Sequence, residues 1–256
     1  LVYSVESVLP DGGFLPDAAI SPVVDIQRQR LEDGEKLVSE VAAEFGARGL
    51  VCTTQVVFGS PAHTITEVAD KEGADLVVAG SGNKGAIESF IMGSVTRALV
   101  SAAHCSFLVG KNPVGVSQAL SVLVATDHSD YASRCLARFA SLAPTGIGKL
   151  TIVTADTMDP NVREAVDNAE GITHGEVLAR KNETLKKSLL AVSKDIDCHV
   201  IAGSANDAID EAMKLTRADL LIIGAQGHGF LERMVMGSTA MHMVGSAPWN
   251  VLVLRV

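Results

Sequence analysis

The sequence predicts an α/β fold made of two tandem, open, five-stranded parallel-sheet domains of the doubly wound type. The first of them lacks its N-terminal strand and helix. Three observations lead to this prediction: the chain of 256 residues repeats itself once, short apolar runs alternate with segments of helical periodicity, and aromatic residues make up only 4% of the chain. The apolar content of 47% rests on small residues that let helices lie close on a sheet.

The internal repeat sets the domain count. Residues 74–109 align without a gap on residues 218–253. Both segments begin with ADL, carry a glycine shortly afterwards and contain the triplet MGS, and most other positions exchange one apolar residue for another. A repeat of this length indicates two tandem domains rather than a solenoid.

We assign the two domains to residues 1–112 and 118–256. The stretch KNPVGVSQ (111–118) lies between the copies and contains Pro113 and Gly115, so it is expected to be a short linker.

The second copy carries every element that such a domain needs. Apolar, β-branched runs predict buried parallel strands, and apolar residues at helical spacing predict helices that cover both faces of the sheet. The strands are expected at 120–127, 149–156, 197–203, 219–225 and 250–256, and the helices near 131–143, 175–194, 205–216 and 238–244. Between the second strand and its helix we expect a long loop.

The first copy starts later than the second. Its opening LVYSVES (1–7) corresponds to LTIVTAD (150–156), so nothing corresponds to the strand at 120–127 and the helix after it. Loss of a central strand should leave two unpaired strand ladders. Our interpretation is a truncated sequence, and the alternative is a domain that has lost the strand and borrows another.

Composition excludes several classes of protein. No apolar run approaches the roughly 18–20 residues of a membrane span, and no secretory signal is visible. The net charge of −9 argues against a nucleic-acid binder. The cysteines are widely spaced without a CxxC pair, which predicts free thiols in a reducing cytoplasm; they are Cys52, Cys105, Cys135 and Cys198.

A glycine-bearing loop in the second copy is the candidate site. Gly224 ends the fourth strand and Gly227 lets the main chain approach a ligand, while Gly237 and Ser238 stand where the next helix begins. Helix amides, the helix dipole and a hydroxyl then form a cradle for an anion such as phosphate. The alternative is structural, with Gly224 serving only the turn and Ser238 only the N-cap. Neither GxxxxGK[ST] nor GxGxxG is present at the expected place.

The spacing G-x2-G-x9-G-[ST] after the fourth strand resembles the universal stress protein family, over nearly the whole chain as a tandem pair. The resemblance implies an adenine-nucleotide α-hydrolase-like fold that holds ATP, with or without Mg²⁺ or Mn²⁺. It places the triphosphate on this loop and the nucleoside on Asp127, whose alternative role is to cap the following helix. The ATP-binding residues are expected to be Ala125, Thr126, Asp127, Val153, Ile223, Gly224, Gln226, Gly227, Gly237, Ser238, Thr239 and Ala240.

The first copy departs from this pattern. Asn83 stands where the second glycine should be, and the acidic first strand is absent. We expect this degenerate site to bind nucleotide weakly or not at all; its residues are Gly80, Asn83, Gly93, Ser94, Val95 and Thr96.

No catalytic residue and no metal ligand is predicted. The sequence shows no Ser/His/Asp or Cys/His arrangement with a local signature. Histidines without metal-ligand partners at helix spacing are His63, His104, His174 and His242. Slow ATP hydrolysis is the most that we expect.

Three functions follow as hypotheses. The first is an ATP-binding regulatory module of the stress response. The second is a scaffold that binds no nucleotide and acts through domain pairing, since the resemblance implies that strands 106–110 and 250–256 pair antiparallel in an intrachain pseudo-dimer. The third is an enzyme on the same layout, such as a flavin-linked electron carrier or an adenylating enzyme. The expected partners are an adenine nucleotide and at most a second copy of the chain, without nucleic acid or membrane.

Overall fold

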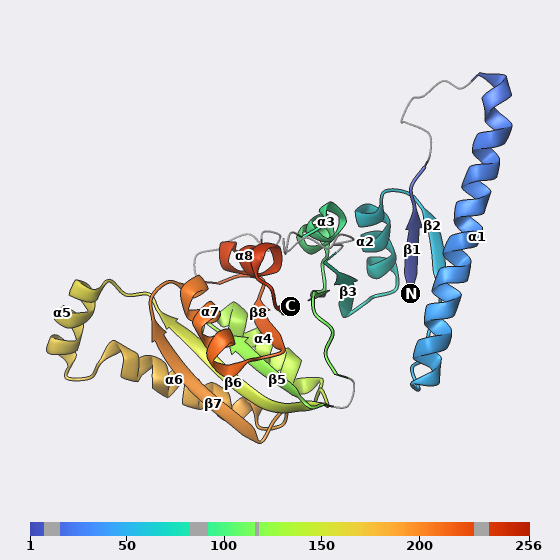
Figure 1. Ribbon diagram of the computed structural model, residues 1–256. Coiled ribbons are helices and arrows are strands. Elements are labelled where there is room, and N and C mark those ends of the chain that lie inside the picture. Colours follow the sequence, from blue (N-terminus) through green and yellow to red (C-terminus); the bar gives the residue numbers. More distant parts are fainter. Residues whose placement is uncertain (8–15, 82–91, 116–117, 228–235) are drawn as a thin grey trace. The chain divides into compact units, whose positions relative to one another are not determined.

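The computed structural model describes residues 1–7, 16–81, 92–115, 118–227 and 236–256 (Figure 1). These residues form two compact units. The first comprises Leu1–Ala74 with Ala98–Ala103, and the second comprises Asp75–Arg97 with His104–Val256. Within the described ranges, no helix has the length and apolar character that a membrane span requires.

The first unit is built around two parallel strands, and a long helix packs against them. Its elements are β1 (Val2–Val5), α1 (Asp17–Ala47), β2 (Gln55–Phe58) and α2 (Pro61–Lys71). Gly34 lets α1 lie close to β1, because a Cβ at this position would come within 2.7 Å of the Tyr3 ring. The close packing of α1 on β1 therefore depends on glycine, which has no side chain, at position 34.

The second unit contains a seven-stranded sheet in the order β3-β4-β9-β8-β5-β6-β7. Its strands are β3 (Leu76–Gly80), β4 (Ser106–Gly110), β5 (Leu120–Ala125), β6 (Ile147–Asp156), β7 (Asp195–Ala202), β8 (Leu220–Gly224) and β9 (Asn250–Leu254). All neighbours are parallel except β4 and β9. The predicted α/β fold with mainly parallel sheets is confirmed.

The antiparallel pair joins the two copies. Phe107 lies opposite Val253 and Leu108 lies opposite Leu252, so the last strand of the first copy continues the sheet of the second. This is the predicted pairing of the two terminal strands, and it is confirmed.

The strands of the first copy form two separate ladders, as the sequence predicts. Among the described residues, β1 pairs only with β2, and β3 pairs only with β4 and so ends the larger sheet. Their counterparts in the second copy, β6 and β8, both pair with β5. Among the described residues, β1 and β3 therefore each have one edge without a partner strand.

Helices cover both faces of the second copy's sheet. They are α4 (Asp130–Ser141), α5 (Pro160–Glu170), α6 (His174–Leu189), α7 (Ala205–Thr216) and α8 (Ser238–Ser246), and α3 (Ser94–Ala102) precedes β4. A core under α4 and α6 includes Val124, Leu136, Ile152 and Leu189. None of the residues of α7 belongs to this core, although α7 contacts β5 and β6. It packs on the opposite face, where alternate strand residues point.

Helix α5 corrects the predicted long loop between β6 and α6. Asp159 caps it by accepting from the amides of Asn161 and Val162, Pro160 occupies the first helical position, and Gly171 ends it at φ 64°. None of the residues of this helix whose burial is described is buried, and Val162 is 54% exposed. Hydrophobic periodicity, which carried the other helix predictions, therefore had no signal here.

The linker between the copies is fixed at its first residue. The backbone amide of Lys111 donates to Asn250 Oδ1 at 2.7 Å, and its ammonium donates to Met243 O at 3.3 Å and to Ala247 O. These carbonyls belong to the C-terminal end of α8, where a cation interacts favourably with the helix dipole.

Lys111 should make stability depend on pH. Burial lowers the pKa of its ammonium from 10.5 to about 8. Between these values the unfolded chain holds a proton that the folded chain has released, so this group raises the free energy of unfolding as the pH rises. We expect the wild type to gain stability relative to Lys111→Met from pH 8 to pH 10.5, with a constant difference at lower pH. Urea titrations of both proteins measure it, and a constant difference across the whole range would contradict this assignment.

Candidate functional site

The loop that follows β8 is fixed at both ends by backbone hydrogen bonds. The amide of Ala225 donates to Leu254 O at 2.9 Å, and the amide of Gly237 donates to Ala225 O at 2.8 Å. The end of β8 and the start of α8 therefore lie side by side at the carboxyl edge of the sheet, where open α/β sheets bind ligands.

Helix α8 begins without a side-chain cap. Its N-cap is Gly237, and the hydrogen bond from Met241 N to Gly237 O at 2.9 Å closes its first turn. The amides of Ser238, Thr239 and Ala240 have no acceptor inside the helix. Ser238 is the first helical residue, so the interpretation of Ser238 as the N-cap is wrong. Amides at the positive end of a helix dipole attract an anion.

Asp127 lies against the glycine loop. Its Oδ1 accepts a hydrogen bond from Ser129 N at 2.9 Å, which holds the turn before α4. The N-cap of α4 is Ser129 rather than Asp127, because the Ser129 side chain accepts from Ala132 N. A Cβ on Gly227 would lie only 2.6 Å from Asp127 Oδ2. The aspartate and the glycine loop, which are far apart in the sequence, are therefore in contact.

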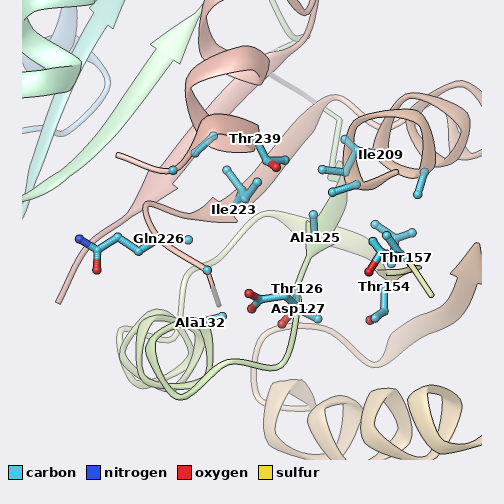
Figure 2. A pocket seen from close by; sticks show the side chains of 18 of the residues that line it. Ala125, Thr126, Asp127, Ala132, Thr154, Thr157, Ile209, Ile223, Gln226 and Thr239 are labelled. Carbon is cyan, nitrogen blue, oxygen red and sulfur yellow. The ribbon is translucent and has the colours of Figure 1, made fainter. Parts of the chain in front are cut away.

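These groups line a pocket of about 500 Å³, a size that suits a small-molecule ligand. Figure 2 shows Asp127 and Thr239 on opposite sides of it. The structure brings every residue expected to bind ATP to this pocket: Ala125, Thr126, Asp127, Val153, Ile223, Gly224, Gln226, Gly227, Gly237, Ser238, Thr239 and Ala240.

Comparison with known proteins decides the family. The model of the universal stress protein family matches residues 7–111 and again residues 120–255. The chain belongs to the universal stress protein family. It contains two universal stress domains in tandem.

Relatives and solved structures agree with this assignment. A universal stress protein of Methanocaldococcus jannaschii is 31% identical over 44% of this chain, and the match spans 64% of that relative. One from Mycobacterium tuberculosis is 25% identical over 90% of this chain and 77% of its own length. The crystal structure of a universal stress protein from Archaeoglobus fulgidus has a TM-score of 0.63 at 22% identity, over 99% of this chain and 84% of that one, and shows the common fold.

The first universal stress domain repeats the backbone of the loop ends. The amide of Ser81 donates to Gly110 O and the amide of Gly93 donates to Ser81 O, both at 2.9 Å. These are the counterparts of the bonds made by Ala225 and Gly237. The frame of the loop is therefore the same in both domains.

The residues at the loop differ between the two domains. In the first domain the hydroxyl of the buried Thr96 donates to Gly80 O at 2.9 Å. Thr96 corresponds to Ala240, which lines the pocket of the second domain. Ser94 and Val95 are exposed at the start of α3, and Asn83 lies outside the described residues. Weak or absent nucleotide binding in this domain stays a prediction.

One wall of the second domain's pocket was missed by sequence analysis. Three of its residues, His174, Leu178 and Lys181, follow a helical spacing on α6, a pattern that could have been found. The others come from the ends of β6, α4 and α7; they are Ala132, Thr154, Ala155, Thr157, Ala205, Ala208 and Ile209. In the sequence, His174 stands out only as a possible metal ligand without partners at helix spacing.

A buried carboxylate holds His174 at this wall. Asp156 is 4% exposed, and its Oδ1 lies 3.0 Å from His174 Nδ1 and accepts from Met158 N at 3.2 Å. The Nε of Arg163 forms an ion pair with Oδ2 at 3.0 Å, while Arg163 Nη2 donates to Met158 O at 3.0 Å. The charge of Asp156 is thus compensated inside the protein, and the imidazole is fixed at the edge of the pocket.

Proposed function

We propose that the second universal stress domain binds ATP in this pocket and serves as a nucleotide-binding regulatory module of the stress response. One observation carries the proposal: the first amides of α8, the glycine loop and Asp127 meet around the same cavity. An anion-binding group beside a carboxylate suits a ligand with a phosphate chain and hydroxyl groups.

In this proposal the triphosphate lies on the amides of Ser238 to Ala240 and on the glycine loop. Asp127 accepts hydrogen bonds from the ribose hydroxyls, since a carboxylate only accepts. The base lies on apolar residues of β5 and β6, among them Ala125 and Val153, which are 8% and 1% exposed. Mg²⁺ or Mn²⁺ would enter with the triphosphate. A reducing cytoplasm suits this module, because its four cysteines form no disulfide.

Substitution of Ser238 by proline tests the role of the amides. Ser238 is the first helical residue, where proline is well tolerated, and the extended Gly237 (ψ 151°) before it is compatible with a following proline. The change removes one amide donor and one hydroxyl while it leaves the helix in place. We expect ATP affinity to fall by about tenfold or more, the usual effect of losing a charge-assisted hydrogen bond.

Ser238→Ala is the matched control, because it removes the hydroxyl and keeps the amide. Isothermal titration of ATP into the wild type and both variants separates the two groups. Equal affinity of the proline and alanine variants would show that the amide does not hold the ligand, and a wild type without measurable ATP binding would end the proposal.

A second candidate function rests on the β4–β9 pair. The two domains share one sheet through backbone hydrogen bonds that need no nucleotide, which favours a stress scaffold that acts through domain pairing. Binding of ATP distinguishes the two functions, because the scaffold does not require it.

A further inference from the structure

The part of the pocket away from the glycine loop, here called the slot, has apolar side chains in its lining and two threonines, here called its rim. Ala155 of β6 and Ile209 of α7 line the slot, and Figure 2 shows Thr154 and Thr157 on this side, opposite Gln226. A flat aromatic base is the part of a nucleotide that such a slot binds best, since its faces are apolar. With the phosphates at α8, the base of the proposed ligand lies here.

His174 stands at this rim with one ring nitrogen engaged. Its Nδ1 lies 3.0 Å from the buried Asp156 carboxylate, which can only accept, so Nδ1 carries the proton of the neutral imidazole. The backbone of the same residue is held by Asp167, whose Oδ1 accepts from His174 N at 2.7 Å. His174 Nε2 has no hydrogen-bond partner among the residues that the structure describes, and its lone pair makes it an acceptor.

We propose that His174 Nε2 accepts a hydrogen bond from the exocyclic amine of adenine and so selects ATP over GTP. This inference rests on the proposed function. Adenine carries an amine donor where guanine carries a carbonyl acceptor. An acceptor at this place therefore bonds to adenine and leaves guanine with two unmatched lone pairs facing each other.

Asp156 is the positioning residue in this arrangement. It keeps the proton on Nδ1 and therefore keeps Nε2 an acceptor. The Nε of Arg163 forms an ion pair with the other oxygen of this carboxylate at 3.0 Å. An asparagine at position 156 could donate to Nδ1 instead, and the ring would then carry its proton on Nε2, the wrong polarity for adenine.

Dissociation constants for ATP and for GTP, measured by isothermal titration at pH 8 on each variant, test the inference. We expect the wild type to bind ATP about tenfold or more tighter than GTP, the effect of one well-placed base contact. His174→Leu should bring the ratio close to one, mainly through weaker ATP binding. His174→Gln should retain much of the preference, because its amide oxygen accepts. Asp156→Asn should lower the ratio although His174 is still present.

His63→Leu is the matched control, since His63 is an exposed residue of α2 whose side chain is 74% exposed. It should leave both constants unchanged. Circular dichroism identifies any variant that does not fold, and the ratio of the two constants in the remaining variants still tests the inference. A wild type that binds ATP and GTP equally, or a ratio unchanged in His174→Leu, would overturn the inference and leave the proposed function standing. A wild type that binds neither nucleotide would overturn both.

Discussion

Gly227→Val is expected to weaken ATP binding by about a hundredfold or more. A Cβ at this position would lie 2.6 Å from Asp127 Oδ2, so a branched side chain must displace the carboxylate that we assign to the ribose. The same side chain stands where the glycine loop would meet the phosphates. Both halves of the proposed site are lost in one substitution, and equilibrium binding of labelled ATP measures the loss.

Gly245→Ala is the control for this change. Gly245 belongs to α8, and a Cβ there meets no atom within 4 Å. Alanine favours a helix over glycine, so we expect unchanged affinity and equal or greater stability. Equal ATP affinity of Gly227→Val and the wild type would contradict the placement of the ligand against Gly227.

Phe107→Ala is expected to lower the free energy of unfolding by about 3–5 kcal/mol. Phe107 is 1% exposed and lies opposite Val253, which is fully buried, in the antiparallel pair that joins the two copies. Loss of the ring leaves a cavity at this junction. Urea denaturation followed by circular dichroism measures the change.

Val78→Ala in the neighbouring strand β3 is the control. Val78 is 62% exposed, and substitutions at such positions usually change stability by about 0.5 kcal/mol or less. A similar loss in both variants would show that the junction contributes nothing special. ATP affinity of folded Phe107→Ala is a separate readout. We expect it to stay near the wild-type value, because Phe107 does not line the nucleotide pocket.

The fold and half of the site could be predicted because their signals are local or repeated. The repeat fixed the domain count, and the spacing of Gly224, Gly227 and Gly237 carried the family resemblance from which the ATP-binding residues were predicted. The β4–β9 pairing came from family resemblance and not from periodicity. Helix α5 was missed because none of its residues whose burial is described is buried, so no apolar stripe marks it in the sequence.

The orientation of the His174 imidazole could not be predicted from the sequence. Its contact with Asp156 joins the end of β6 to the start of α6 across the unpredicted helix. Neither residue carries a signature of this pairing in the sequence. Only the folded chain places a buried carboxylate behind the imidazole, and in our proposal this carboxylate makes Nε2 the acceptor.

The β4–β9 junction also changes how the assembly responds to dilution and to mutation. Two separate chains that met through such strands would dissociate as their concentration fell, whereas here the partner is always tethered nearby. In a symmetric dimer every substitution occurs twice, but in this chain it occurs once. One half can therefore change by substitution while the other does not, and dilution does not carry the two halves apart.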